Sequence, residues 1–237
     1  QIGDNGTIKT EMGLVNVTDC IKVIGGKIAH IGTVAEGSIS VGDTASAEID
    51  RVRRLSTSRN HSATHLLQKA LRTVLGTHVE QAGSYVTPDR LRFDFTHFAA
   101  MTAEEIQQVE DIVNEKILES LPITATQESI EDARKLGAMA LFGEKYGNIV
   151  RVVNMGGYSI ELCGGAHLDN TAQVGSFKIV SESGIASGVR RIEALTGAAA
   201  LKYYQQQEET LKAVCKAVKA TPDNMLKRVE TMIAEQK

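Results

Sequence analysis

Two short pairs of potential metal ligands constrain the folding of this chain more than any other feature. His61 and His65 are four residues apart, and Cys163 and His167 repeat that spacing about a hundred residues later. Histidines four apart on a helix lie on one face, about one turn apart, so both can reach one ion. Thiolate and imidazole are together the donors that zinc favours. The sequence therefore predicts a Zn²⁺ site with four protein ligands.

Two other interpretations of these four residues stay open on the sequence alone. A buried His or Cys is more often a satisfied core residue than a ligand, although here the residues form two metal-spaced pairs. Four protein ligands also make a closed tetrahedral site, which usually holds a structural zinc, whereas a catalytic zinc keeps one position open. The spacing does not separate a structural zinc from a catalytic one.

The composition is typical of a globular chain. Its 237 residues, 42% of them hydrophobic, are enough for two ordinary domains or for one domain with an appendage. No apolar run has the length of a membrane span, no signal peptide opens the chain, and Gln1 is not an initiator residue, so we expect a piece of a longer, non-membrane protein. Three scattered cysteines argue against a disulfide framework and favour a reducing compartment, the cytosol.

The charge pattern limits how the chain can bind nucleic acid. A formal net charge of −3 gives no general attraction to a polyanion, so any such binding depends on local patches. One candidate patch is the basic run at residues 51–54 with Arg59, which is as readily a solvated face. A second candidate is Arg190 with Arg191.

The periodicity of the first half predicts a sheet followed by helices. Residues 1 to about 50 alternate over short runs broken by glycines, which indicates a small β barrel or sheet with a Gly25-Gly26 hairpin. Ser58 can cap a helix that carries His61 and His65 in its first turns and stops at Gly76. A strand at 91–95 and a helix from the Thr102–Glu105 capping box to Pro122 complete this half.

The second half predicts hairpins and then helices. We expect a short helix capped by Ser129, a hairpin of strands at 149–155 and 158–162, further strands at 176–181 and 189–194, and helices from 197 and from the Thr221-Pro222 cap. The last helix runs to residue 237 as a coiled coil would. The fold class is therefore α+β, with a β barrel at 1–55, a mixed α/β zinc-binding core at 56–196 and a helical linker at 197–237.

Four strings in the chain closely resemble the editing domain of alanyl-tRNA synthetase. They are RNHSATHLL at 59–67, LRFDF at 91–95, GAMALFGEKY at 137–146 and SGVRRIEA at 187–194. The resemblance covers nearly the whole chain, so that residues 1 to about 50 correspond to that enzyme's β barrel and the C-terminal helices to the start of its coiled linker. The ATP-dependent aminoacylation domain that precedes these parts in the family is absent.

The resemblance implies an editing hydrolase of the cytoplasm. Its substrate would be alanine tRNA that carries serine or glycine, and its partners would be the other domains of the same synthetase. A pocket built for alanine cannot strongly reject glycine, which is smaller, or serine, which adds only a hydroxyl, because such discrimination reaches only about 10–200-fold. A second, hydrolytic site supplies the remaining selectivity.

The resemblance also assigns roles to individual residues. The family's zinc ligands carry over to His61, His65, Cys163 and His167. Gln81 falls at a glutamine important for editing, and Thr64 at a position associated with recognition of the serine hydroxyl. Substrate or tRNA contacts are expected at Arg92, Asp94, Arg190 and Arg191. The family usually has Thr in the Cys-Gly-Gly-Thr-His segment where this chain has Ala166.

Alternatives of other kinds remain at this stage. Gln81 and Thr64 taken alone read as a surface amide and a hydroxyl bonded back to its own helix, and Arg92 with Asp94 as a salt bridge. The chain as a whole could be a non-catalytic tRNA-binding module with a structural zinc. The editing domain of threonyl-tRNA synthetase shares the two metal-spaced pairs, but residues 188–194 and the β segment ahead of the zinc helix favour the alanyl type.

Overall fold

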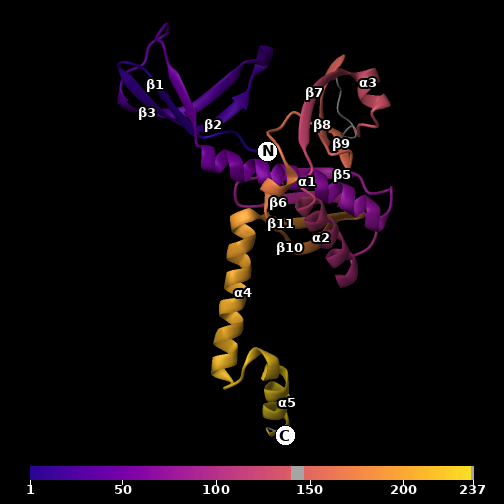
Figure 1. The fold of residues 1–237 in the computed structure, drawn as a ribbon. Coiled ribbons are helices and arrows are strands. Elements are labelled where there is room, and N and C mark those ends of the chain that lie inside the picture. Colours follow the sequence, from indigo (N-terminus) through magenta and orange to yellow (C-terminus); the bar gives the residue numbers. More distant parts are fainter. Residues whose placement is uncertain (140–146, 236–237) are drawn as a thin grey trace. The chain divides into compact units, whose positions relative to one another are not determined.

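A computed structural model of the chain describes residues 1–139 and 147–235 (Figure 1). Helices alternate with strands along the sequence, and the strands within each of the three sheets pair antiparallel, which confirms the α+β class. The chain divides into two compact units, Gln1–Gly197 and Ala198–Lys237. Within the described residues, no helix combines the length and the apolar character that a membrane span requires. Most of the string at 137–146 lies outside the described residues.

The first sheet is open, which corrects the expectation of a closed barrel. Its strands are β1 (Gly6–Lys9), β2 (Gly13–Lys22), β3 (Ile28–Gly37) and β4 (Ser46–Ile49), all antiparallel in the order β3-β2-β1-β4. Barrel diameter grows with strand number, and even eight strands leave an interior only wide enough for side chains, so four strands are too few to close around a core. The predicted Gly25-Gly26 turn is confirmed, since both glycines have positive φ between β2 and β3.

The main core lies between a second sheet and two helices. The sheet contains β5 (Gln81–Val86), β6 (Leu91–Thr96), β10 (Phe177–Ala186) and β11 (Val189–Thr196), in the order β10-β11-β6-β5. Helices α1 (Arg51–Leu75) and α2 (Ala103–Leu118) supply many of the other apolar side chains of this core. Its largest fully buried side chains include Phe93, Phe95, Phe177, Leu66, Leu67 and Leu71. This packing makes α1 a fixed support for the side chains on its other faces.

Helix α1 begins seven residues before the predicted cap. Asp50 is the N-cap, and its carboxylate accepts a hydrogen bond of 2.9 Å from the backbone N–H of Arg53. Ser58 therefore lies inside the helix, where it is buried. The basic run at 51–54 forms the first turn of α1, so His61 and His65 lie near the middle of the helix rather than at its start.

A third sheet carries one half of the candidate site. It contains β7 (Ile123–Ser129), β8 (Ile149–Met155) and β9 (Ser159–Leu162), in the order β7-β8-β9. The predicted hairpin of β8 and β9 is confirmed with a turn at 156–157, and so is the Ser129 cap of α3 (Ile130–Lys135). The Thr102 capping box opens α2 as predicted. A 3-10 turn, η2 (Thr171–Val174), precedes β10.

The second unit is a pair of helices. It contains most of α4 (Gly197–Ala217) and all of α5 (Met225–Glu235), joined through the 3-10 turn η3 (Pro222–Asn224). Thr221 and Asn224 form the cap that the Thr-Pro pattern indicated, although the α-helix proper begins at Met225. The buried Cys215 thiol lies 3.6 Å from the Met225 sulfur and links the two helices.

Candidate metal centre

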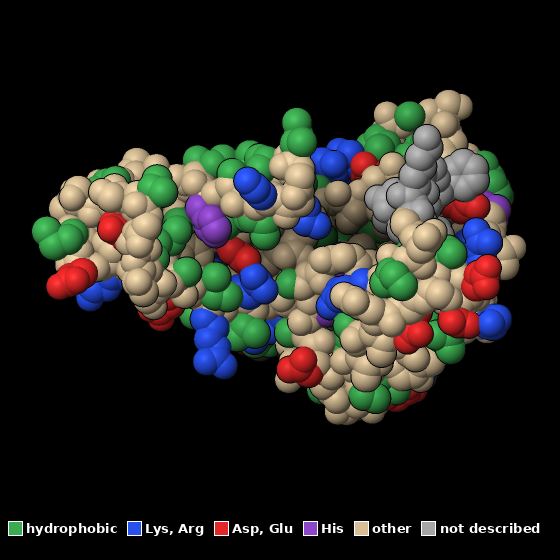
Figure 2. Space-filling view, turned by 90° about the horizontal axis from the view of Figure 1, so that it is seen from above, with side chains coloured by type: hydrophobic (Ala, Val, Ile, Leu, Met, Phe, Trp, Pro, Cys, Tyr) green, Lys and Arg blue, Asp and Glu red, His purple; other side chains and the backbone are tan. Residues whose placement is uncertain are grey.

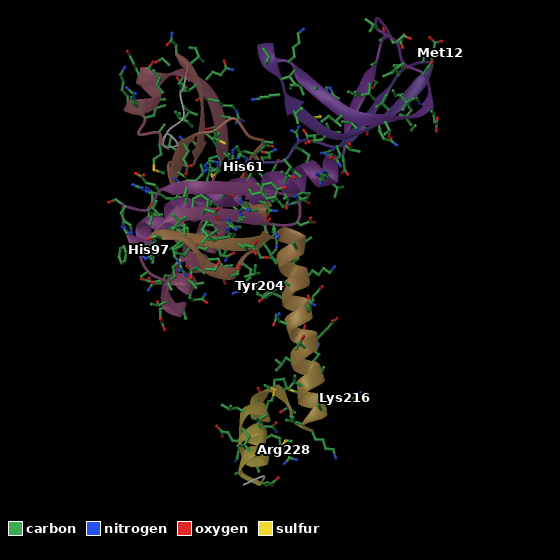
Figure 3. The ribbon with its side chains drawn as sticks, turned by 180° about the vertical axis from the view of Figure 1, so that it is seen from behind. Met12, His61, His97, Tyr204, Lys216 and Arg228 are labelled. Atoms are coloured by element: carbon green, nitrogen blue, oxygen red, sulfur yellow. The ribbon has the colours of Figure 1, made fainter. Side chains whose placement is uncertain are left out.

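The fold brings the two ligand pairs together. Helix α1 presents His61 and His65 on one face, Cys163 follows directly after β9, and His167 lies in the loop beyond it. One ligand atom from each of the four residues lies within 4.8 Å of the others. Figure 3 shows His61 on α1, beneath the third sheet. A helix and a strand end that are a hundred residues apart therefore form one cluster of three imidazoles and one thiol.

The outer nitrogen of each ring has a protein partner. His65 Nδ1 lies 2.7 Å from Glu161 Oε2, His61 Nδ1 lies 3.2 Å from the Ala166 carbonyl, and His167 Nδ1 lies 3.1 Å from Ser62 Oγ. A carbonyl or carboxylate oxygen only accepts, so His61 and His65 donate through Nδ1. Ligand histidines in metal sites are oriented by contacts of this kind. The partners leave Nε2 as the inward-facing atom of each ring.

The inward atoms converge on the sulfur of Cys163. Its Sγ lies 3.5 Å from His61 Nε2 and 3.3 Å from His167 Nε2. His65 Nε2 is buried and has no hydrogen-bond partner among the described residues. A buried polar atom without a partner is costly, and a metal ion among these four donors would satisfy it. The residues present therefore fit a tetrahedral ion with three nitrogen ligands and one sulfur ligand, a set that suits Zn²⁺.

The surroundings of three of the four residues set their ionisation states. Burial opposes ionisation of the Cys163 thiol, but hydrogen bonds with His167 and His61 outweigh burial and lower the pKa of the thiol to about 2. Burial opposes protonation of His65, but the Glu161 carboxylate outweighs it and raises the pKa of the imidazole to about 10. Burial lowers the pKa of His167 to about 4, which keeps that ring neutral at pH 7. The cluster thus pairs the Cys163 thiolate with a protonated His65, and a metal ion bound there would replace the proton of His65.

The loop between Cys163 and His167 is held from both sides. Arg151 on β8 donates through Nη1 to the carbonyls of Cys163 at 2.9 Å and Gly165 at 2.8 Å. A Cβ at Gly165 would lie 2.0 Å from His61 Cε1, so only glycine leaves room for that ring. Gly164 has open space around it by the same measure. The two glycines therefore have different roles.

Ala166, where the resemblance leads us to expect Thr, acts through its backbone. Its carbonyl accepts from His61, and its N–H donates to Gln1 Oε1 at 2.9 Å. Neither contact requires a side-chain hydroxyl, so Ala166 is compatible with the ring orientation that the cluster needs.

Thr64 and Gln81 lie on different elements. Thr64 is buried in α1, and its hydroxyl donates to the Asn60 carbonyl at 2.8 Å. Gln81 begins the edge strand β5 opposite Phe95 and is half-buried. A register shift between Gln81 and Gly83 interrupts the ladder at this point. Gln81 therefore lies next to an irregularity in the hydrogen-bonded ladder between β5 and β6.

Three of the four predicted substrate contacts form one network, and the fourth does not. Arg191 donates from Nε and Nη2 to the buried Asp94 carboxylate at 2.7 and 2.8 Å, and Arg92 Nε lies 3.8 Å from the same group. Arg190 instead donates to both oxygens of Glu182, because successive side chains on a strand point to opposite faces.

Sequence reasoning missed the residues that orient the ligands. The sequence did not single out Ser62, Glu161 or Arg151. Ser62 follows the ligand His61, Glu161 lies two residues before Cys163, and Arg151 pairs through its carbonyl with the N–H of Cys163. Glu161 precedes Cys163 by two positions, the spacing that places two strand residues on the same side. That spacing was the one signal that could have found it.

The chain is similar to known proteins over its whole length. The family described as Threonyl and Alanyl tRNA synthetase second additional domain matches residues 150–193. The chain is 58% identical over all 237 residues to the alanine–tRNA ligase of Acetivibrio thermocellus and 52% identical over the same length to that of Clostridioides difficile. It is 52% identical over 235 residues to that of Listeria welshimeri. In each case the chain spans only 27% of the relative's length.

Proposed function

We propose that this chain, which corresponds to a segment of the alanyl-tRNA synthetases that includes their second additional domain, is an editing hydrolase. Its substrates would be Ser-tRNA and Gly-tRNA formed wrongly on alanine tRNA. The observation that carries the proposal is the cluster of His61, His65, Cys163 and His167, whose donors converge within 4.8 Å. A metal ion held by such a cluster suits hydrolysis of an activated ester.

The proposed metal is Zn²⁺, held by those four residues. When bound, zinc supplies positive charge that polarises a carbonyl or fixes the amino-acid end of the substrate. Glu161, Ser62 and the Ala166 carbonyl hold the three rings with Nε2 inward, and Cys163 contributes the thiolate. Because the thiolate is surrounded by three rings, Cys163 is better suited to holding the ion than to attacking an ester.

Gln81 and Thr64 would handle the reacting groups. The Gln81 amide has two donors and a carbonyl oxygen, which is enough to position the ester and a water molecule together. The Thr64 hydroxyl donates a hydrogen bond to the Asn60 carbonyl, so its oxygen still has lone pairs that can accept a hydrogen bond from a serine hydroxyl. An alanine side chain would leave that acceptor unpaired, and a buried unpaired acceptor costs about 1–3 kcal/mol.

The arginine pairs would contact the tRNA end. Arg191 donates hydrogen bonds from Nε and Nη2 to Asp94, and Arg190 donates from the same two atoms to Glu182. The Nη1 donors of each guanidinium stay available to a phosphate or ribose. Asp94 fixes the orientation of the Arg191 guanidinium, and Glu182 fixes that of Arg190. This lowers the entropy that the side chains lose when they bind the tRNA.

The rest of the synthetase would complete the reaction cycle. Since the relatives are about four times as long as this chain, we propose that their other domains attach the amino acid and deliver the tRNA. All three cysteines are free thiols, which suits the cytoplasm.

One other role has a specific observation in its favour. The four donors complete a tetrahedral set by themselves, as in structural zinc sites. The chain would then be a tRNA-binding module whose zinc only joins α1 to β9. This role predicts that the chain binds tRNA but does not release serine from it.

The test is deacylation of alanine tRNA charged with serine or with alanine. We expect the zinc-loaded chain to release serine and to leave alanine attached. Cys163→Ala should abolish release, Gln81→His should reduce it by at least tenfold, and Cys215→Ala, a buried cysteine in the second unit, serves as the control. Full activity of Cys163→Ala would overturn the proposal.

A further inference from the structure

A basic groove adjoins the metal centre. It has a volume of about 660 Å³, within the range of roughly 300–1,000 Å³ typical of ligand sites. Its charged side chains are Lys22, Arg54 and Arg151, its floor includes Gly164 to Ala166, and no Asp or Glu is among its lining residues. Figure 2 shows Lys and Arg side chains around a hollow on this face of the molecule. Lys and Arg are therefore the charged side chains among the residues that line the groove.

The groove and the metal centre share one loop. Gly164 to Ala166 line the groove, while Cys163 and His167 on either side are ligands of the cluster. The Ala166 carbonyl accepts from His61, and the Gly165 carbonyl accepts from Arg151. A molecule whose reacting end lies at the cluster can therefore extend directly into the groove.

The three cationic side chains differ in how many contacts they already make within the protein. Arg54 makes a two-point ion pair with Asp4, and Arg151 holds the ligand loop. Lys22 ends β2 and is exposed, with no ion pair among those found in the described part of the chain. An ammonium on a flexible stem binds a phosphate as a point charge. Lys22 is therefore the cation most available to a ligand.

We propose that the groove holds the phosphates of the single-stranded nucleotides that precede the ester-bearing end of the substrate tRNA. This inference rests on the proposed function, because it places the ester at the metal centre. Each nucleotide carries one negative charge, and phosphate contacts position a nucleic acid without reading its sequence. Lys22 contacts one phosphate, and Arg151 adds positive potential, whereas the charge of Arg54 is balanced by Asp4. The N-terminal sheet thereby becomes part of the substrate site.

The first test measures binding of a fluorescein-labelled RNA tetranucleotide by anisotropy at several salt concentrations. Lys22→Ala should weaken binding by about three- to tenfold at low salt and flatten the slope of log affinity against log salt by about 0.7. Lys22→Glu should weaken it further. Lys9, an exposed lysine on β1 outside the groove, supplies the controls Lys9→Ala and Lys9→Glu, which should bind as the wild type does.

Hydrolysis of serine from alanine tRNA separates this inference from the proposed function. We expect Lys22→Glu to raise KM severalfold with kcat unchanged. Active wild-type protein with unaltered RNA affinity and KM in Lys22→Glu overturns the groove and leaves the function standing. Inactive wild-type protein whose RNA binding still depends on Lys22 overturns the function and leaves the groove as a nucleic-acid site. No measurable RNA binding by the wild type, or equal losses in the Lys9 variants, also overturns the groove.

Discussion

The orientation of single rings decides what the metal centre can hold. His65 is buried, donates from Nδ1 to Glu161, and has an inward Nε2 without a partner in the described residues. Glu161 is itself buried and accepts a hydrogen bond of 2.8 Å from Ser159. A charged carboxylate is kept here at the cost of desolvation. In return, the Glu161 carboxylate orients the His65 ring through the contact with Nδ1.

Replacing Glu161 should therefore weaken metal binding. Glu161→Gln keeps an oxygen that accepts from His65 but removes the charge. We expect the affinity for zinc to fall about 10–100-fold, the usual effect of losing such an orienting group. Competition with a fluorescent chelator measures it. The exposed Glu131→Gln is the control, and equal affinities in both variants would contradict the role of Glu161.

The two neighbouring glycines supply a second pair of variants. Gly165→Ala places a methyl group 2.0 Å from His61 Cε1, whereas Gly164→Ala places one in open space. We expect Gly165→Ala to displace the His61 ring and lose at least tenfold in zinc affinity, and Gly164→Ala to bind zinc as the wild type does. Titration with zinc checks both. Equal behaviour of the two variants would show that His61 is not constrained by this loop.

At the level of elements, α1 is the support of the site. Its apolar face is buried in the main core, and its Asp50 cap lies about three turns before His61. The cap therefore contributes to helix stability without touching the ligands. The helix can lose some stability at its first turn while the ligand pair stays in place.

Removal of the cap tests that separation. Asp50→Ala should lower the free energy of unfolding by about 1 kcal/mol, since the backbone N–H of Arg53 loses its acceptor. Zinc affinity should change by less than twofold. Urea denaturation with and without zinc measures both quantities, with Asp50→Asn as the conservative control. A large loss of zinc affinity would mean that the first turn and the site unfold together.

The sequence was most informative where local chemistry decides the structure. The Thr102 box, the Ser129 cap and the hairpin of β8 and β9 follow from two to four adjacent residues, and all three are confirmed. The predicted start of α1 was wrong, because the basic run at 51–54 lacks the apolar periodicity that indicates a helix. β5 and β7 were missed, since Gly83 interrupts one and the other is mostly polar and exposed.

The site, too, was predictable only where neighbouring residues decide the structure. The ligand spacings indicated the cluster of four donors, although helix geometry explains only the spacing of His61 and His65. Arg151 and the groove depend on how β8, the ligand loop and the N-terminal sheet meet, which is set by tertiary packing. The barrel was expected from alternation, but closure depends on strand number and register that alternation does not specify.

At the scale of the whole molecule, the core does not depend on the metal. The main core joins α1, α2 and the central sheet through side chains such as Phe93, Phe95 and Phe177, none of which belongs to the cluster. The metal would instead fix the loop after β9 against α1. The first unit should thus fold without the ion and gain stability when the ion binds.

Chelation tests this independence. With zinc at a hundredfold excess over its Kd, binding adds about 2.7 kcal/mol, so removal should lower the Tm by roughly 5–11 °C. The far-UV circular dichroism at 25 °C should keep its helical signal. Collapse of that signal on chelation would instead identify the zinc as essential to the fold, as the non-catalytic alternative requires.

The central claim is that the four-donor cluster serves selective ester hydrolysis. The most direct measurement is the rate at which the zinc-loaded chain releases serine, compared with alanine, from the same alanine tRNA. We predict rapid release of serine, retention of alanine, and loss of the serine reaction in Cys163→Ala. Equal release of both amino acids, or serine release that persists in a folded Cys163→Ala variant, would contradict the account.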